Sequence, residues 1–282
     1  MDTHLALSSL ITLSFFLAIL LPSYCTDDES FVECSRPYGC GRIKFSYPFW
    51  GGDRPEHCGR QGFELECYYN EYPIIKFKEL EFLVLSESQN NMTIARLDLW
   101  HGSCPQTYPD TVLNHSIFDY SPTVLNITLF YNCPLAVSTL IPVQNRFNCS
   151  WEGSDRNDNA YFVNESFAKF HGLAQCRGKI RVPISRNAII DESAGVVREL
   201  HEALNQGFEV DYDAVRLACS GCVESGGYCG SNVTHQFVCF CRDGERSYNC
   251  QGKNMLALFS SHFPGLGYSI LLVLGLVLMV YT

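Results

Sequence analysis

The stretch that decides the fold runs from Cys40 to Cys67 and reads CGRIKFSYPFWGGDRPEHCGRQGFELEC. Residues 45–50 within it form the aromatic run FSYPFW, with cysteines, glycines and arginines on both sides. A small disulfide-rich module needs large side chains to fill its centre, and aromatic side chains bury the most area per residue. The stretch therefore predicts a stapled module whose core is largely aromatic.

Alternation along the aromatic run would place Phe45, Tyr47 and Phe49 on one face of a strand. We expect Phe45 and Phe49 to be core residues, whereas Tyr47 and Trp50 are the better candidates for a contact with a sugar. A structural role for most of the run is favoured over a binding role, because large aromatics usually lie inside.

The N-terminus predicts the secretory pathway. Residues 5–21 are apolar or hydroxylic, and residues 1–25 are typical of a signal peptide cut after Cys25, although no Lys or Arg precedes the apolar part. Removing Cys25 from the 15 cysteines leaves 14, which predicts up to seven disulfides in an oxidising compartment. These are Cys34, Cys40, Cys58, Cys67, Cys104, Cys133, Cys149, Cys176, Cys219, Cys222, Cys229, Cys239, Cys241 and Cys250.

Two further signals agree with an extracellular chain. Six Asn-x-Ser/Thr sequons predict glycosylation, at Asn91, Asn114, Asn126, Asn148, Asn164 and Asn232. Residues 266–282 form a hydrophobic run with no Lys or Arg after it. This run is either a signal for a GPI anchor or a short single-pass helix. Both alternatives attach the protein to the outer face of a membrane.

The net charge of the chain limits the classes of partner that it is expected to bind. The formal net charge is −10, so nucleic acid is excluded as an expected partner. Residues 34–62 differ from the whole, with five basic and two acidic residues and hence a local charge of +3. A second basic strip, Arg177, Lys179 and Arg181, would share one face of a strand, and a plain solvated face is the favoured interpretation of it.

The 225 residues from Thr26 to Cys250 are enough for two small modules. We expect a β-rich, disulfide-stapled fold with modules over residues 30–105 and 123–250. Strands are predicted over residues 74–77, 82–85, 92–97 and 124–131. One notable helix is predicted over residues 194–205, capped by Ser193 and ended by Gly207.

Two cysteine-and-glycine patterns carry a resemblance to a known family. The first module resembles the galacturonan-binding domain of plant wall-associated receptor kinases, through Cys34, YGCG at 38–41, Ile43, YPFW at 47–50, Cys58-Gly59, Gly62-Phe63, Leu65 and Cys67. The second resembles their C-terminal domain, through CSGC at 219–222, SGG at 225–227, Cys229-Gly230 and FVCFC at 237–241. Both domains occur in this order in ectodomains of receptor-like kinases of the leaf-rust-resistance-locus type.

The resemblance implies a pectin ligand, a chain of galacturonate units. Carboxylates suit arginine, and sugar C–H faces suit flat rings. The candidate ligand-binding residues are therefore Arg36, Arg42, Lys44, Tyr47, Trp50, Arg54 and Arg60. No cofactor or metal site is expected; calcium bridging to pectin is conceivable, but no calcium-binding motif supports it.

The spacing C-x-C-x8-C at Cys239, Cys241 and Cys250 is similar to the end of an EGF-like module. That similarity implies the pairs Cys219–Cys229, Cys222–Cys239 and Cys241–Cys250, although sequence alone leaves the connectivity open.

The resemblance also implies a function. We expect a cell-surface, non-catalytic polysaccharide-binding protein, receptor-like but without kinase motifs, that works with a partner receptor kinase. The alternative is a protein- or peptide-binding co-receptor module. An extracellular hydrolase is less favoured, because the sequence has no GxSxG or HExxH motif.

Overall fold

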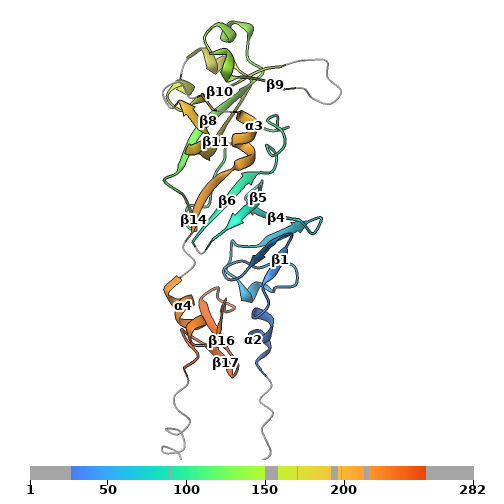
Figure 1. The fold of residues 1–282 in the computed structure, drawn as a ribbon, viewed down its shortest axis with the longest axis vertical. Helices are drawn as coiled ribbons and strands as arrows, with labels where there is room; N and C mark the ends of the chain where they lie inside the picture. Colours follow the sequence, from blue (N-terminus) through green and yellow to red (C-terminus); the bar gives the residue numbers. More distant parts are fainter. Residues whose placement is uncertain are drawn as a thin grey trace, which may run out of the picture.

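The computed structural model describes residues 27–88, 90–149, 158–169, 171–191, 196–197, 199–212 and 216–251. These residues form an elongated molecule with three units arranged along its long axis (Figure 1). The first and last described segments lie together at one end of the molecule. The predicted signal peptide and the hydrophobic run at 266–282 fall outside the described residues. Among the described residues, no helix is long and apolar enough to cross a bilayer.

The middle unit is built on a six-stranded antiparallel sheet in the order β3-β4-β5-β6-β14-β7. Its strands are β3 (Leu65–Tyr68), β4 (Tyr72–Phe77), β5 (Leu80–Glu87), β6 (Asn91–Arg96), β7 (Phe118–Tyr120) and β14 (Phe208–Tyr212). The strands predicted at 74–77, 82–85 and 92–97 are thus confirmed. A hairpin of β1 (Tyr38–Cys40) and β2 (Ile43–Phe45) packs beside this sheet.

The six-stranded sheet also contains a strand from the second expected module. Strand β14 comes from late in the chain, yet it pairs with β6 on one side and β7 on the other. Phe208 and Val210 of β14 join the core formed by the first module. The two modules expected from the sequence are therefore interleaved, because the chain returns to complete the first sheet.

The upper unit holds a four-stranded sheet in the order β11-β8-β10-β9 (Figure 1). Its strands are β8 (Val124–Tyr131), β9 (Arg146–Cys149), β10 (Asp158–Asn164) and β11 (Gly178–Ser185). Strand β8 has the predicted bounds. Leu200, Ala203 and Leu204 of helix α3 (Leu200–Gln206) pack on this sheet with Leu99.

The predicted helix is shorter than expected. Helix α3 begins at Leu200, and Glu199 occupies its N-cap position without a side-chain hydrogen bond. Val196 and Val197 instead form strand β13 (Val196–Val197), which pairs with β12 (Ile189–Asp191). The prediction of a helix from residue 194 was therefore wrong at its start, because valine favours extended backbone. Its end was right: Gly207 follows with a φ of +67°.

The lower unit is cysteine-rich. Helix α4 (Arg216–Glu224) leads into a three-stranded sheet of β15 (Tyr228–Ser231), β16 (Phe237–Cys241) and β17 (Gly244–Arg246). Helix α2 (Glu29–Cys34), at the other end of the chain, packs against it (Figure 1). A Cβ on Gly230 would lie 2.3 Å from the carbonyl oxygen of His57, so only glycine allows this close approach between distant segments.

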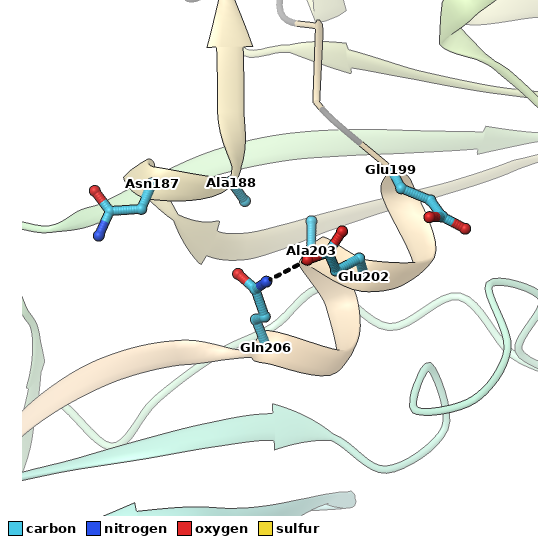
Figure 2. A pocket seen from close by; sticks show the side chains of 6 residues that line it. All are labelled: Asn187, Ala188, Glu199, Glu202, Ala203 and Gln206. Carbon is cyan, nitrogen blue, oxygen red and sulfur yellow. Dashed lines mark hydrogen bonds between the residues drawn. The ribbon is translucent and has the colours of Figure 1, made fainter.

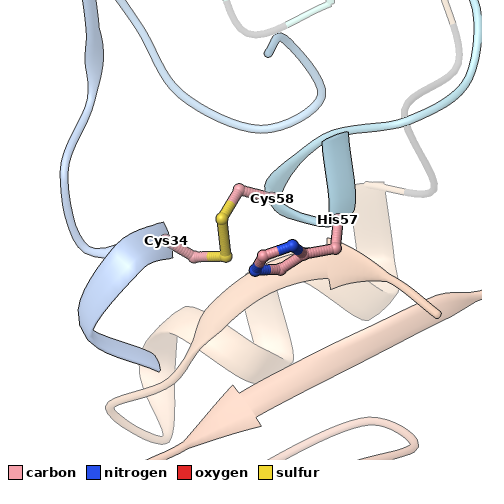
Figure 3. A group of neighbouring side chains, drawn as sticks. All are labelled: Cys34, His57 and Cys58. Atoms are coloured by element: carbon pink, nitrogen blue, oxygen red, sulfur yellow. A yellow bond between two sulfur atoms is a disulfide. The ribbon is translucent and has the colours of Figure 1, made fainter. Parts of the chain in front are cut away.

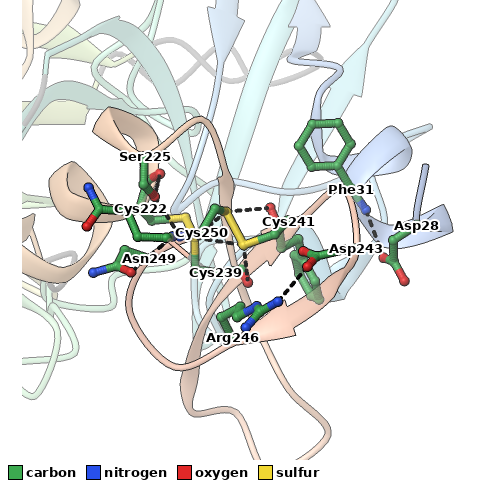
Figure 4. Close-up of a disulfide and its surroundings, with 12 residues drawn as sticks. Asp28, Phe31, Cys222, Ser225, Cys239, Cys241, Asp243, Arg246, Asn249 and Cys250 are labelled. Carbon is green, nitrogen blue, oxygen red and sulfur yellow. Dashed lines mark hydrogen bonds and ion pairs between the residues drawn. A yellow bond between two sulfur atoms is a disulfide. The ribbon is translucent and has the colours of Figure 1, made fainter. Parts of the chain in front are cut away.

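All fourteen predicted cysteines are paired. The three pairs implied by the EGF-like spacing, Cys219–Cys229, Cys222–Cys239 and Cys241–Cys250, are confirmed. Figure 4 shows the last of these, where the backbone N–H of Cys250 also donates to Ser225 Oγ. The remaining pairs are Cys34–Cys58, Cys40–Cys67, Cys104–Cys149 and Cys133–Cys176.

Glu87 on β5 gives a pH-dependent prediction. Burial raises the pKa of Glu87, although the hydroxyl of Tyr212 donates to it at 3.1 Å. The folded state thus holds this proton more tightly than the unfolded state, so the stability that it supplies is present at low pH and is lost as pH rises. Glu87→Gln should unfold at a higher temperature than the wild type at pH 7 but not at pH 4. A constant difference between the two pH values would contradict this.

Candidate functional site

The largest hollow in the described first module follows strand β3. It encloses about 890 Å3 and is bordered by Arg36, Tyr38, Asp53 and Asn70 among others. A second hollow of about 320 Å3 contains Trp50 and Lys76 and shares two residues with the first. We call this continuous surface the β3 trough. The shared residues are Glu64 and Glu66.

The β3 trough has mixed charge. Asp53, Glu64 and Glu66 contribute carboxylates, while Arg36 is the exposed cation of the larger hollow. Lys76 is paired with Glu66 at 2.7 Å and with Glu81 at 3.3 Å. These acidic residues were not among the predicted ligand-binding residues, because an acidic sugar chain suggests cations as partners. The alternation of exposed Glu64 and Glu66 with buried Leu65 was the available signal.

Tyr38 adds a neutral donor to this surface. Burial, and then the charges of Glu66 and Asp53, raise the pKa of its phenol. The hydroxyl therefore keeps its proton throughout the physiological range. A phenol, carboxylates and a guanidinium side by side can bind both hydroxyl and carboxylate groups of a ligand.

Arg54 does not belong to the exposed cations. Its side chain is 4% exposed. The guanidinium donates to the carbonyl oxygens of Phe49 at 3.1 Å, Cys58 at 2.7 Å, Cys34 at 2.8 Å and Arg36 at 2.6 Å. Burial lowers its pKa to about 10, which leaves it charged at neutral pH. Arg54 borders the larger hollow, but its N–H groups donate to backbone carbonyls and so position the backbone of Arg36. Direct contact of Arg54 with a ligand stays a prediction.

The other predicted cations differ in environment. Arg42 and Lys44 are exposed on the β1–β2 hairpin, and Lys44 pairs in register with Gly39, which borders the β3 trough. Arg60 is partly exposed, and its backbone binds Pro48 and the Trp50 indole. The structure thus brings Arg36 and Lys44 to one side of the trough and leaves Arg60 near Trp50.

The residues of the aromatic run lie in different environments. Phe45 and Phe49 are fully buried, as predicted. The chain does not continue as a strand, however: β2 ends at Phe45, and the N–H of Phe49 donates to the carbonyl of Ser46 in a turn. Trp50 packs against the core on one side and lines the β3 trough on the other.

Tyr47 faces the lower unit. Its ring meets Phe237 edge-on with centroids 5.9 Å apart, and it contacts the cysteine cluster of that unit. Nearby, the hydroxyl of Ser231 donates to the carbonyl of Gly59 at 2.6 Å in a buried hydrogen bond. The Tyr47 ring therefore helps to join two units, and its exposure to a sugar is limited.

His57 lies at the same junction. Figure 3 shows its ring beside the Cys34–Cys58 disulfide. The centroids of the His57 and Phe240 rings are 5.6 Å apart. The Nε2 atom of His57 lies 3.0 Å from Glu33 Oε2. The sulfur atoms are bonded to each other, so this group does not supply the thiolates that a zinc site needs.

A small hollow of about 130 Å3 lies at helix α3 (Figure 2). Glu199 and Glu202 border it, and Gln206 donates to Glu202 at 2.9 Å. Its size and its two carboxylates make it unsuitable for an acidic sugar.

The described sequon asparagines are at least partly exposed. Asn114 is exposed, and Asn91, Asn126, Asn164 and Asn232 are intermediate. In two sequons the asparagine oxygen accepts from the hydroxyl of its own motif, Ser116 and Thr234, each at 2.7 Å. The side chain of Asn148 falls outside the described residues.

The role of Arg54 gives a stability prediction. Arg54→Ala removes the donor from four carbonyl groups and should lower the free energy of unfolding by about 3 kcal/mol. Arg42→Ala, an exposed arginine of the same module, should change it by less than about 0.5 kcal/mol. Denaturant unfolding followed by tryptophan fluorescence compares the two. Equal effects would show that Arg54 has no structural role, and Arg54→Lys serves as a milder variant if Arg54→Ala does not fold.

Two segments of the chain are similar to known protein domains. Residues 34–98 match the model for the wall-associated receptor kinase galacturonan-binding domain, and residues 148–244 match the wall-associated receptor kinase C-terminal domain. The lining of the β3 trough lies within the first match. Neither model describes a catalytic domain. No solved structure matches the chain significantly.

Several curated relatives from Arabidopsis thaliana are leaf rust 10 disease-resistance locus receptor-like protein kinase-like proteins. Number 1.4 is 30% identical over 95% of this chain and 38% of its own length. Number 2.8 is 29% identical over 83% of this chain and 25% of its own length. Number 2.4 is 28% identical over 83% of this chain and 36% of its own length. This chain thus spans about a quarter to two fifths of these relatives. Residues 34–98 are thus similar to the galacturonan-binding domain of wall-associated receptor kinases, and residues 148–244 are similar to the C-terminal domain of these kinases.

Proposed function

We propose that this protein binds galacturonan at the cell surface through the β3 trough. The observation that carries the proposal is the position of the trough inside the segment that matches the galacturonan-binding domain. The polymer consists of sugars that each carry one carboxylate and several hydroxyls. A surface for it must therefore combine cations with hydrogen-bond acceptors.

The β3 trough offers this combination. The guanidinium of Arg36 can pair with a carboxylate through two parallel hydrogen bonds. Asp53, Glu64 and Glu66 are acceptors for sugar hydroxyls, and the partly exposed ring of Trp50 offers an apolar surface to a sugar face. The acidic residues also limit the number of ligand carboxylates that the trough tolerates. Affinity for a polymer would then depend on several weak contacts acting together.

The proposed setting is the outer face of the plasma membrane. The predicted signal peptide, the sequons and the hydrophobic run at 266–282 support it. We further propose that a partner receptor kinase transmits the signal, because the matched domains are binding modules.

Binding to galacturonan oligomers tests this proposal. Affinity should fall as salt is raised, because exposed ion pairs are screened. Arg36→Ala should weaken binding on the order of tenfold, which corresponds to about 1.4 kcal/mol. The control is Arg242→Ala, which removes an exposed arginine from the lower unit. A fully methyl-esterified oligomer, which lacks the carboxylates, should bind more weakly. The affinity should also be measured with calcium and with calcium plus a chelator.

Two results would contradict the proposal: no binding at low salt, or equal binding by the Arg36→Ala and Arg242→Ala variants. The first would direct attention to protein ligands. The second would move the site away from the β3 trough.

A second candidate function, protein binding, is favoured by the lower unit. Leu217 and Val223 on α4 are 89% and 58% exposed, and Val233 and Tyr248 are 97% and 68% exposed. We propose that these exposed apolar side chains contact a partner protein. Substitution of Leu217 and Val223 by serine should then impair co-receptor association while galacturonan binding persists.

A further inference from the structure

The upper unit carries a cationic surface that the β3 trough does not include. Strand β11 is an edge of the four-stranded sheet, and Lys179 and Arg181 are exposed on its outer face while Ile180 and Val182 are buried. Arg177, directly before the strand, is also exposed. The predicted alternation of these three basic residues is therefore confirmed.

Lys179 and Arg181 border a hollow of about 360 Å3. Ala168, Lys169 and Thr128 of β8 also line the hollow. Thr128 is 2% exposed and pairs in register with Arg181. Asp110 and Glu165 complete the lining. Three cations thus face two carboxylates, in a chain whose net charge is −10. We call this surface the β11 hollow.

The acidic residues leave the cations largely available. Asp110 accepts a hydrogen bond from the backbone N–H of Arg181 at 2.6 Å, so this carboxylate is already engaged. Glu165 lies 3.7 Å from the guanidinium of Arg181, and both side chains are more than half exposed. Such an exposed pair is screened by solvent and holds the guanidinium of Arg181 only weakly. Within the described parts of the chain, neither Lys169 nor Lys179 has a carboxylate partner, and Lys179 lies 5.8 Å from the centre of the Phe130 ring.

We propose that the β11 hollow is a second site for carboxylate-bearing sugar chains, an inference that rests on the proposed function. Alternate residues on a strand are about 6.8 Å apart, so Lys179 and Arg181 present two charges to successive anionic groups of an extended chain. The exposed carboxylate of Glu165 supplies oxygen atoms for sugar hydroxyls. An edge strand also uses charge to prevent strand pairing, and that role needs no ligand.

A second site changes how a polymer binds. The two sites lie in different units along the long axis (Figure 1). A long galacturonan chain can reach both and gains affinity from the higher effective concentration, whereas a short oligomer occupies one site at a time. The β11 hollow would thus make the protein sensitive to the length of the polymer.

The test uses the full secreted chain, immobilised long galacturonan and a short galacturonan oligomer. Four proteins are compared with the wild type: Arg36→Ala, Lys179→Gln/Arg181→Gln, the combination of all three, and Arg242→Gln/Arg246→Gln as a control with the same loss of charge. Lys179→Gln/Arg181→Gln should weaken binding of the long chain on the order of tenfold and reduce the preference for long over short chains. The charge-matched control should bind as the wild type does.

The outcomes separate the two proposals. If Arg36→Ala loses binding and Lys179→Gln/Arg181→Gln does not, the β11 hollow is only a charged strand edge and the inference is overturned. If Lys179→Gln/Arg181→Gln loses binding and Arg36→Ala does not, the β11 hollow is the binding site and the proposal of a site at the β3 trough is overturned. If the wild type binds neither chain, both proposals are overturned. Equal weakening by the Arg242→Gln/Arg246→Gln control would also overturn the inference, since charge alone would then explain it.

Discussion

The hydrogen bonds of one buried guanidinium organise the first module. Arg54 binds the carbonyl oxygens of residues that are up to 20 positions away, and these include both cysteines of the Cys34–Cys58 disulfide. Burying a charge is costly unless it is fully hydrogen-bonded, so the segments that supply the carbonyls must meet correctly. The same contact fixes the backbone of Arg36 and turns the aromatic run inward. The β3 trough therefore depends on a cation that a ligand hardly reaches.

The units are joined by residues that lie far apart in the chain. Strand β14 completes the first sheet, and Tyr47, His57 and Gly230 bring the cysteine-rich unit against the first module. The two proposed sites lie in different units, and binding of one polymer to both would gain most when their separation is fixed. The interleaved connections, rather than a linker, supply that constraint.

Local patterns predicted much of this fold. Runs of apolar residues predicted β4, β5, β6 and β8, Gly207 located the end of α3, and the resemblance of the cysteine spacing to an EGF-like module implied three disulfides that the structure contains. Burial of Phe45 and Phe49 also followed from their size. Two features depend on distant partners and were not predictable: the burial of Arg54 and the contact of Tyr47 with Phe237. The carboxylates of the β3 trough did have a local signal, the alternation of exposed Glu64 and Glu66 with buried Leu65. The start of α3 was missed because Val196 and Val197 pair with another strand.

The backbone N–H of Asp28 donates to the carbonyl of Arg242 at 3.0 Å, so the beginning and the end of the described chain share one hydrogen bond. Neighbouring termini are compatible with circular permutation. A short linker could join them, and new ends could be opened at an exposed turn such as Lys78–Glu79 between β4 and β5. Such a permuted chain would present its ends in the middle unit. A fluorescent label or surface tether could then be placed there without covering the cysteine-rich end.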